Sequence, residues 1–398
     1  MRPIGALTPL EEDTAIIDGV IKPIERKEVL PIDEALGRVL AADITAAHSA
    51  PPFDRSSMDG YALIRDDLGS IGPYTTLSVV EDIFAGSVAK NKLVRGEAMQ
   101  IATGAPVPEG ADTVVMVEDT KRVGNLVEIY KYPSKGGNIT RKASDIREGE
   151  ILLKAGTVLD PAKVGMLASQ GLSEVSVYVK PIVAIMPTGE EIVPVGKPLG
   201  GGQIYDINSH TLASVVRMNG GVPLVLPITG DEMESLKRSL EQALSSDFAV
   251  ISGGTSVGEK DFMMDLLESM GDVRFHGVKL KPGKPTAFAV VKGKPVLGLP
   301  GYPTSCLMNA YLLLAPALRK MSRLPSGKNR DVAASLGEPV HGAAGRVTFL
   351  PVKLEDGKAY SAFKDSGAIT SARRAHGYIV VPPDAEMPAG AGVEISPF

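Results

Sequence analysis

The sequence is poor in the side chains that build metal centres and disulfides: it has one cysteine, Cys306, and five histidines in 398 residues. A single cysteine excludes an internal disulfide framework. The histidines are scattered, with no pair at the spacing of zinc ligands, so neither a zinc site nor an iron–sulfur site is expected. Apolar runs of the roughly 18 to 20 residues that cross a membrane are missing, and the N-terminus has no signal-peptide segment. We therefore expect a cytoplasmic protein without a membrane partner.

The chain has no excess of basic residues, and aromatic side chains are scarce too. The net charge is −5, tryptophan is absent, and aromatic residues make up 5% of the chain. A nucleic-acid binder usually carries a basic surface and often an aromatic platform, so we expect a small-molecule partner and no nucleic acid. Glycine and proline are plentiful, with 43 and 30 copies, which predicts many turns and several β-rich parts. The length predicts about two to four domains.

The middle of the chain, 177–322, alternates apolar runs with amphipathic ones. Runs typical of buried strands are separated by segments such as 231–244, whose apolar residues recur at steps of three and four. Such alternation is typical of a doubly wound α/β domain with a largely parallel sheet and helices on both faces. Strands are predicted within 181–189, 222–228, 248–252, 273–280, 286–291 and 295–300, and helices within 206–221, 231–244 and 262–271 and from Ser305.

The flanking segments differ from the middle. Residues 48–146 hold short alternating runs interrupted by glycine and proline, which predicts a small β-rich domain. After a polar linker at 325–330, the stretch 346–363 reads as two strands around an Asp-Gly turn, which predicts a barrel-like β domain. The expected fold class is therefore multidomain α/β, with a central doubly wound mixed domain flanked by small β domains.

The polar residues of the middle segment follow its predicted strands. In an open α/β sheet, ligands bind beyond the carboxyl ends of the strands, where such loops meet. We therefore expect one crevice in which carboxylates face lysines. An oxyanion bound together with Mg²⁺ would satisfy both sets, since lysines and loop N–H groups hold the anion and carboxylate oxygens hold the cation. The carboxylates are Glu190, Glu191, Asp231 and Asp261, and the lysines are Lys279, Lys281 and Lys284.

The loop ISGGTSVGEKD, at 251–261, is the candidate anion cradle. Its small residues let backbone amides approach an anion, and the helix that follows points its positive end at it. Ser305 is expected at the N-cap of a later helix, where it could also help to bind an anion. By itself the loop could equally be an ordinary strand-to-helix turn. The cradle residues are Ser252, Gly253, Gly254 and Ser256.

Other interpretations of single motifs stay open. KPGKP, at 281–285, is by itself typical of a solvated hairpin turn. Asp231 could simply cap its helix, and Cys306 fits a small core residue better than a nucleophile. The chain has no GxxxxGK[ST], GxGxxG or GxSxG motif, and His276 and His376 have no evident serine or cysteine partner. Hydrolysis by a nucleophilic triad is therefore not expected.

Seven motifs, in order along nearly the whole chain, resemble those of one family. They are SSMDGYA (56–62), TGAPVPEGAD (103–112), GGNITRKASDI (136–146), PTGEEIVPVGKPLGGGQIYDINSH (187–210), SGGTSVGEKD (252–261), KPGKPTAFA (281–289) and PGYPTS (300–305). Each motif alone is weak evidence, but seven in sequence are highly specific. The chain is similar to the molybdopterin molybdenumtransferases, a family that includes the E domain of gephyrin.

The resemblance implies an enzyme of the last step of molybdenum cofactor biosynthesis. Such an enzyme takes adenylylated molybdopterin and molybdate, with Mg²⁺, and yields the metal-bearing cofactor and AMP. The resemblance also implies a homodimer of four-domain chains, and the stretch 28–44 fits the segmented domain as a helix. The implied domains are a segmented linking domain of 27–47 and 147–176, a β-rich domain of 48–146, an α/β pterin-binding domain of 7–26 and 177–325, and a C-terminal domain of 326–398.

Functional residues of the family are carried over where its motifs match. Acids on which activity depends are matched by Asp59, Asp145, Glu191, Asp231 and Asp261, of which Asp231 and Asp261 would lie near the metal. Molybdate contacts are matched by Lys281, Lys284, Ser305, Arg346 and Ser371. Pterin and phosphate contacts are matched by Thr103, Ser252, Gly253, Gly254, Ser256, Gly258, Pro300 and Pro303.

The chain departs from the family pattern at three positions. Thr140 stands where arginine is common and Ala143 where glycine is common. Gly277 stands where some members have a basic residue, for which Lys279 could substitute. Two alternatives also remain. One is the same reaction with tungstate, whose size and charge nearly equal those of molybdate, and the other is a pterin-binding or scaffolding protein without turnover.

Overall fold

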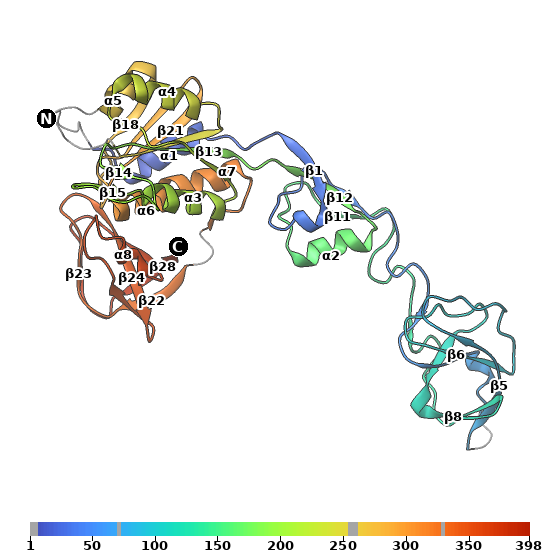
Figure 1. Cartoon of the computed structure of the whole chain (residues 1–398). Coiled ribbons are helices and arrows are strands. Elements are labelled where there is room, and N and C mark those ends of the chain that lie inside the picture. Colours follow the sequence, from blue (N-terminus) through green and yellow to red (C-terminus); the bar gives the residue numbers. More distant parts are fainter. Residues whose placement is uncertain (1–6, 70–72, 254–261, 328–330) are drawn as a thin grey trace. The chain divides into compact units, whose positions relative to one another are not determined.

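The computed structural model describes residues 7–69, 73–253, 262–327 and 331–398. Its contacts divide the chain into two compact units, each with its own hydrophobic cores (Figure 1). The first unit contains the chain up to Val29, Gly37–Val39 and Ser176–Phe398, and the second contains Leu30–Leu36 and Leu40–Val175. The predicted division into four domains is finer than these two units and stays a prediction.

The first unit is built around a six-stranded mixed sheet with the strand order β16-β13-β17-β21-β20-β18. Strand β20 is antiparallel to both of its neighbours, so the other five strands share one direction. This arrangement confirms the predicted mixed α/β sheet. The strands are β13 (Ile182–Pro187), β16 (Val222–Val225), β17 (Phe248–Ser252), β18 (Gly271–His276), β20 (Ala287–Val291) and β21 (Lys294–Leu299).

Helices cover both faces of this sheet, as the alternation predicts (Figure 1). Val183 and Ile185 of β13 point to one face, whereas Ala184 and Met186 point to the other, because side chains alternate along a strand. Both faces are therefore buried, which explains the near-continuous apolar strands. The first face packs against α1 (Leu10–Val20), α3 (Asn208–Met218), α6 (Pro303–Asn309) and α7 (Ala315–Met321), and the second against α4 (Met233–Ala243) and α5 (Phe262–Met270).

The long apolar helix begins earlier than expected. Tyr302 occupies the N-cap position and Pro303 the first helical position, so the prediction of Ser305 as N-cap is wrong. Proline suits the first position because its missing N–H would have no helical partner there. The helix continues from α6 through a π-helical stretch, η4 (Ala310–Leu314), into α7. Ser305 is therefore enclosed within the first turn, at 3% exposure.

The C-terminal segment forms a closed barrel of five strands. Strand β24 pairs with both β25 and β26, and the ring is completed by the pairs β25–β22, β22–β28 and β28–β26. Asp356 and Gly357 join β24 to β25 with φ of 49° and 74°, so the predicted Asp-Gly hairpin is confirmed. The strands are β22 (Val332–Leu336), β24 (Val347–Glu355), β25 (Lys358–Ser361), β26 (Gly377–Val381) and β28 (Gly392–Pro397).

The second unit contains another six-stranded sheet, in the order β7-β4-β6-β5-β9-β8. Both of its faces are packed: Tyr61 and Leu63 join one hydrophobic cluster, and Ala62 joins another. All six strands fall within 48–146, where the sequence predicts β structure. They are β4 (Gly60–Leu63), β5 (Thr75–Ile83), β6 (Glu97–Ile101), β7 (Thr113–Met116), β8 (Thr120–Val123) and β9 (Leu126–Ile129).

The expected helix at 28–44 is wrong. Gly37 has φ of 73°, outside the helical region, and the segment forms two strands with a single 3₁₀ turn. Strand β1 pairs with β12, and β2 pairs with β11, so pairing with distant segments overrides the local helical pattern. The elements are β1 (Lys27–Pro31), η1 (Ile32–Glu34), β2 (Ile44–Thr45), β11 (Ile151–Leu153), α2 (Pro161–Ser169) and β12 (Glu174–Tyr178).

Short elements complete the architecture. In the described ranges, no helix has both the length and the apolar character to cross a bilayer. The short elements are β3 (Arg55–Ser56), η2 (Arg65–Asp67), η3 (Val117–Asp119), β10 (Ile139–Thr140), β14 (Ile192–Val193), β15 (Ile204–Tyr205), β19 (Leu280–Lys281), β23 (Val340–His341), α8 (Thr370–Arg373) and β27 (Glu386–Met387).

Candidate active site at the rim of the central sheet

The loops of the central sheet meet at one edge. Pro187 of β13 lies opposite Ser252 of β17, which lies opposite Leu299 of β21. The reversed strand β20 enters at the same edge, with Ala287 beside Gly298 of β21. The loops after β13, β17 and β21 and the loop before β20 therefore share one rim. This confirms the predicted convergence for the described parts of these loops.

The loop after β17 begins as a narrow turn that requires glycine. Gly253 has φ of 102°, and a Cβ there would lie 2.5 Å from the carbonyl oxygen of Thr188. The Ser252 carbonyl accepts the Thr188 N–H (2.9 Å), and the Gly253 N–H donates to Leu299 O (3.2 Å), so this amide holds the turn itself. The predicted roles of Gly254, Ser256, Gly258 and Asp261 stay predictions, because these residues lie outside the described ranges.

Three carboxylates gather where the loops after β13 and β16 meet. Thr188 and Thr229 form a bridge between these loops, and Asp231 lies close enough to Glu191 and Glu190 to sense their charges. Asp231 is half-buried. Burial raises the pKa of its carboxyl group above the ordinary value, and the negative charges of Glu191 and Glu190 raise it further. Asp231 therefore holds a proton more readily than an ordinary aspartate does.

The Asp231 side chain has no helix-capping role in the structure. Asp231 does not cap α4, because Glu232 occupies the N-cap position and no side-chain cap bond forms there. Hard carboxylate oxygens are the ligands that Mg²⁺ prefers, and a cation relieves the mutual repulsion. Within the described ranges, no group of three or more acidic, histidine or cysteine side chains is arranged around a metal position. Asp261, the other predicted ligand, lies outside those ranges.

The loop before β20 carries Lys281 and Lys284 and is fastened to two neighbours. Gly283, with φ of 109°, accepts a hydrogen bond from the buried side-chain amide of Asn309 (3.0 Å). Strand β19 runs parallel to β24 of the barrel, with Lys281 beside the second residue of β24. Arg346 directly precedes β24 and so lies beside this loop. This register sets the backbone of Arg346 beside Lys279, two residues before Lys281, and the contacts of these cations with molybdate stay predictions.

The two serines predicted to contact molybdate are enclosed. Ser305 is 3% exposed and Ser371 is fully buried. The Ser371 hydroxyl accepts the Lys364 N–H (3.0 Å) and lies 3.5 Å from the Asp365 carbonyl, to which it donates. The N–H of Thr304 in α6 donates to a carbonyl of the loop before α8 (3.0 Å), so the segments that carry the two serines touch. Their contact with molybdate stays a prediction.

Asp59, Thr103 and Asp145 belong to the second unit. The Asp59 carboxylate accepts the Thr103 N–H (2.8 Å), and both residues are exposed, as Asp145 is. Ala143 has φ of 60°, a left-handed conformation that glycine adopts more readily than alanine. The Thr140 hydroxyl hydrogen-bonds to a nearby serine hydroxyl (2.7 Å). The structure therefore pairs Asp59 with Thr103, and the catalytic roles of these acids stay predictions.

Cys306 is a core residue, as the sequence predicts. It is fully buried, and burial raises the pKa of its thiol to about 12. Its Sγ lies 3.9 Å from Ser252 Oγ. A thiol with so high a pKa is not ionised near neutral pH and does not act as a nucleophile.

The folded protein is expected to be inert toward a thiol-reactive disulfide reagent at about pH 8, since the thiolate is the reactive form. The chain unfolded in urea should react with one equivalent, because Cys306 is its single cysteine. The absorbance of the released thiol group measures both reactions. Rapid labelling of the folded protein would show that the Cys306 thiol is accessible.

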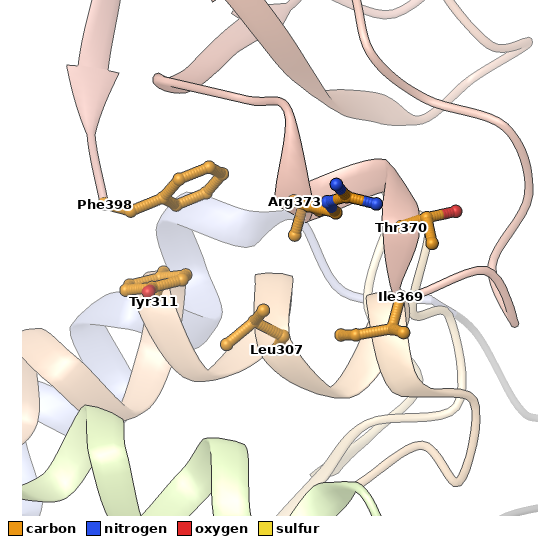
Figure 2. A pocket seen from close by; sticks show the side chains of 7 residues that line it. Leu307, Tyr311, Ile369, Thr370, Arg373 and Phe398 are labelled. Carbon is orange, nitrogen blue, oxygen red and sulfur yellow. The ribbon is translucent and has the colours of Figure 1, made fainter.

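A cavity of about 340 Å³ lies between α6, η4 and the C-terminal segment (Figure 2). Figure 2 shows the rings of Tyr311 and Phe398 on one side of it, with centroids 4.9 Å apart, and Arg373 on the other. This lining is mostly apolar and includes none of the predicted site residues, so it lacks the mixed charge of the rim. The lining residues are Leu307, Tyr311, Ile369, Thr370, Ala372, Arg373 and Phe398.

Two buried asparagines at the rim were missed by the sequence analysis. Asn208 begins α3 and donates to Gly301 O (2.8 Å), in the loop that carries the buried Pro300 and the half-buried Pro303. Asn309 ends α6 and holds the lysine loop. The available signal was a polar amide within an otherwise apolar helical stretch, such as SCLMNAYLLLA for Asn309. Both side chains position loops that carry predicted site residues.

Three family models match successive parts of the chain. The MoeA N-terminal region (domain I and II) matches residues 8–171, and a probable molybdopterin binding domain matches 184–320. The MoeA C-terminal region (domain IV) matches 333–398. The order of the three regions agrees with the order of the sheets described above.

Proteins similar over most or nearly all of the chain are known. A putative molybdopterin biosynthesis protein of Methanocaldococcus jannaschii is 32% identical, over 97% of this chain and 96% of its own. The molybdopterin molybdenumtransferase of Haemophilus influenzae is 37% identical, over 74% of this chain and 72% of its own. A crystal structure of a molybdopterin biosynthesis MoeA protein from Pyrococcus horikoshii is 39% identical with a TM-score of 0.86, over 98% of this chain and 99% of that chain.

The sheet architecture, the charged rim and the matched regions together define a multidomain protein of the MoeA type. The identity to curated relatives exceeds 30% over most of both chains. The chain belongs to the molybdopterin molybdenumtransferase family.

Proposed function

We propose that this protein inserts molybdate into adenylylated molybdopterin and releases AMP, as the last step of molybdenum cofactor biosynthesis. The main support for the proposal is that acidic and basic side chains lie on loops at the same edge of the central sheet. The Asp231 cluster lies on the loops after β13 and β16, and the Lys281 loop enters the same edge before β20. A substrate with phosphate groups, a metal oxyanion and Mg²⁺ is complementary to both sets of charges.

Lys281, Lys284 and Arg346 are the proposed cationic contacts of molybdate. Molybdate is a tetrahedral dianion, so groups that hold phosphate also suit it, and the arginine fork can bind two of its oxygens at once. The pairing of β19 with β24 supports this role, because it sets Arg346 beside the lysine loop. Ser305 and Ser371 belong to the same proposed set, on two segments that touch.

Asp231 and Asp261 are the proposed ligands of Mg²⁺, with Glu191 as a neighbouring acid. When bound, Mg²⁺ neutralises charge on the phosphates of the adenylyl anhydride whose P–O bond breaks. The chain's own groups bind and orient the substrate: Ser252 and Gly253 begin the proposed phosphate cradle. The pterin dithiolene supplies soft sulfur ligands for molybdenum, which agrees with the enclosure of Cys306 in the core.

The oligomeric state, the location and the second unit's residues belong to the proposed function as well. We infer a homodimer, as the family resemblance implies, and a cytoplasmic location, as the sequence predicts. Asp59 and Asp145 are proposed as catalytic acids and Thr103 as a pterin contact; within the second unit the Asp59 carboxylate accepts the Thr103 N–H.

The decisive experiment incubates the purified protein with adenylylated molybdopterin, Mg²⁺ and molybdate and measures AMP by chromatography. We expect AMP in amounts that rise with molybdate until the pterin is consumed. Absence of AMP despite tight pterin binding would instead support the scaffolding alternative. Tungstate added in competition with molybdate identifies the preferred oxyanion, since the two ions share size and charge.

A further inference from the structure

Asn208 links two loops of the rim. It is the first residue of α3 and is 8% exposed. Its side-chain Nδ2 donates to Ser252 Oγ (2.9 Å), at the end of β17, and to Gly301 O (2.8 Å), just after β21. These strands are neighbours in the sheet, so one amide group ties the start of the proposed phosphate cradle to the start of the PGYPTS loop.

The orientation of the Asn208 amide is determined by its partners. The Gly301 carbonyl can only accept a hydrogen bond, so the atom that faces it must be the amide nitrogen. The other atom, Oδ1, is buried and has no hydrogen-bond partner in the part of the chain that the structure describes. A buried amide oxygen without a donor is unfavourable for folding, so only the Nδ2 side of this amide is used by the described residues.

The contact with Asn208 also orients the Ser252 hydroxyl. Because Ser252 Oγ accepts from Nδ2, its own hydrogen remains available for another acceptor. The acceptor nearest to this hydroxyl among the described contacts is Cys306 Sγ, 3.9 Å from Ser252 Oγ, and a thiol sulfur is a weak acceptor. A phosphate oxygen is a far stronger acceptor, because hydrogen bonds to ionised groups are about twice as strong as neutral ones.

We propose that Asn208 is a positioning residue of this enzyme: it holds Ser252, at the end of β17, and Gly301, just after β21, in place and directs the Ser252 hydroxyl toward the phosphate groups of the adenylylated pterin. This inference rests on the proposed function and deepens it. Asn208 acts through Ser252 and Gly301 and needs no contact of its own with the reacting atoms.

Asn208→Asp tests the role with little change of shape. The carboxylate cannot donate, so both hydrogen bonds are lost and a negative oxygen faces the Gly301 carbonyl. We expect the KM for adenylylated molybdopterin to rise about tenfold or more, as for loss of a charge-assisted contact, while the KM for molybdate stays within about twofold. Steady-state AMP release with each substrate varied in turn measures the two constants.

Asn219→Asp is the matched control. Asn219 lies at the other end of the same helix and is also 8% exposed, and its Nδ2 donates to Val215 O (2.8 Å). Both variants should lower the melting temperature, but Asn219→Asp should leave both KM values unchanged. Equal kinetics for the two variants would overturn the inference, while a parent protein without AMP release would overturn the proposed function instead.

A double-mutant cycle separates positioning from general damage. Ser252→Ala removes the oriented hydroxyl and should raise the pterin KM by a similar factor. The variant Asn208→Asp with Ser252→Ala should then be no worse than the poorer single variant, because the two residues act on one contact. Independent, multiplying effects would contradict the mechanism. If Asn208→Asp does not fold, the smaller Asn208→Ser takes its place in the same cycle.

Discussion

Asp231→Asn is expected to slow AMP release from adenylylated molybdopterin by about two to three orders of magnitude, the usual effect of removing one group that stabilises developing charge. Asparagine keeps the shape of aspartate but loses the charge that would hold Mg²⁺. Burial and, after it, the negative charges of Glu191 and Glu190 already oppose this charge and raise the pKa of Asp231. The rate is measured by chromatography of AMP at saturating molybdate.

The same substitution is expected to raise the melting temperature at neutral pH. Burial and the two glutamates raise the folded-state pKa of Asp231 above its ordinary value of 3.8, so the charged carboxylate destabilises the folded protein. This destabilisation is present at neutral pH and disappears as the pH falls below the ordinary pKa, where the group is protonated in both states. The stability gain of Asp231→Asn should therefore shrink as the pH is lowered toward about 4.

Glu234→Gln is the control for Asp231→Asn. It removes one negative charge from the exposed start of α4, where Glu234 pairs with Lys237. A surface pair of this kind contributes little, so neither the rate nor the melting temperature should change measurably. If Asp231→Asn and Glu234→Gln gave equal rates, the role of Asp231 in catalysis would be refuted. Loss of activity together with gain of stability is the signature expected of a functional acid.

Gly283→Ala is expected to cause the second large loss. The φ of 109° is unfavourable for alanine, and its Cβ would lie 2.3 Å from Nδ2 of the buried Asn309. Backbone strain of about 1–3 kcal/mol and overpacking of about 1–3 kcal/mol add to a destabilisation of several kcal/mol. Displacing the loop that carries Lys281 and Lys284 should also reduce kcat/KM for molybdate by about a hundredfold.

Gly293→Ala is the control that separates backbone strain from the clash with Asn309 in Gly283→Ala. Gly293 lies in the turn between β20 and β21 with φ of 77°, but a Cβ there meets nothing within 4 Å. This control therefore carries backbone strain without the clash. Its melting temperature should fall less than that of Gly283→Ala, and its kinetics with molybdate should match the parent. Equal kinetic losses in both variants would show that the contact with Asn309 does not position the lysine loop.

Local patterns predicted most of the secondary structure around the rim. The strand 182–187 and the helix 233–243 were recognisable because their apolar residues follow the periods of a strand and a helix. The hairpin at 356–357 was recognisable because Asp-Gly favours the positive φ that its turn requires. The segment 28–44 misled the sequence analysis, because its pairing partners lie far along the chain.

The alternation of strands and helices, the charged loops after the strands and the motifs that indicate the family could all be predicted from local stretches of sequence. Each of these depends on residues close together in the chain, where periodicity and turn chemistry act. Three features are visible only in the folded structure. They are the closure of the barrel, the placing of Arg346 beside the lysine loop, and the hydrogen bonds of Asn208 to Ser252 and Gly301. Such contacts join segments distant in the chain, so strand register and helix packing, which no local pattern encodes, bring them together.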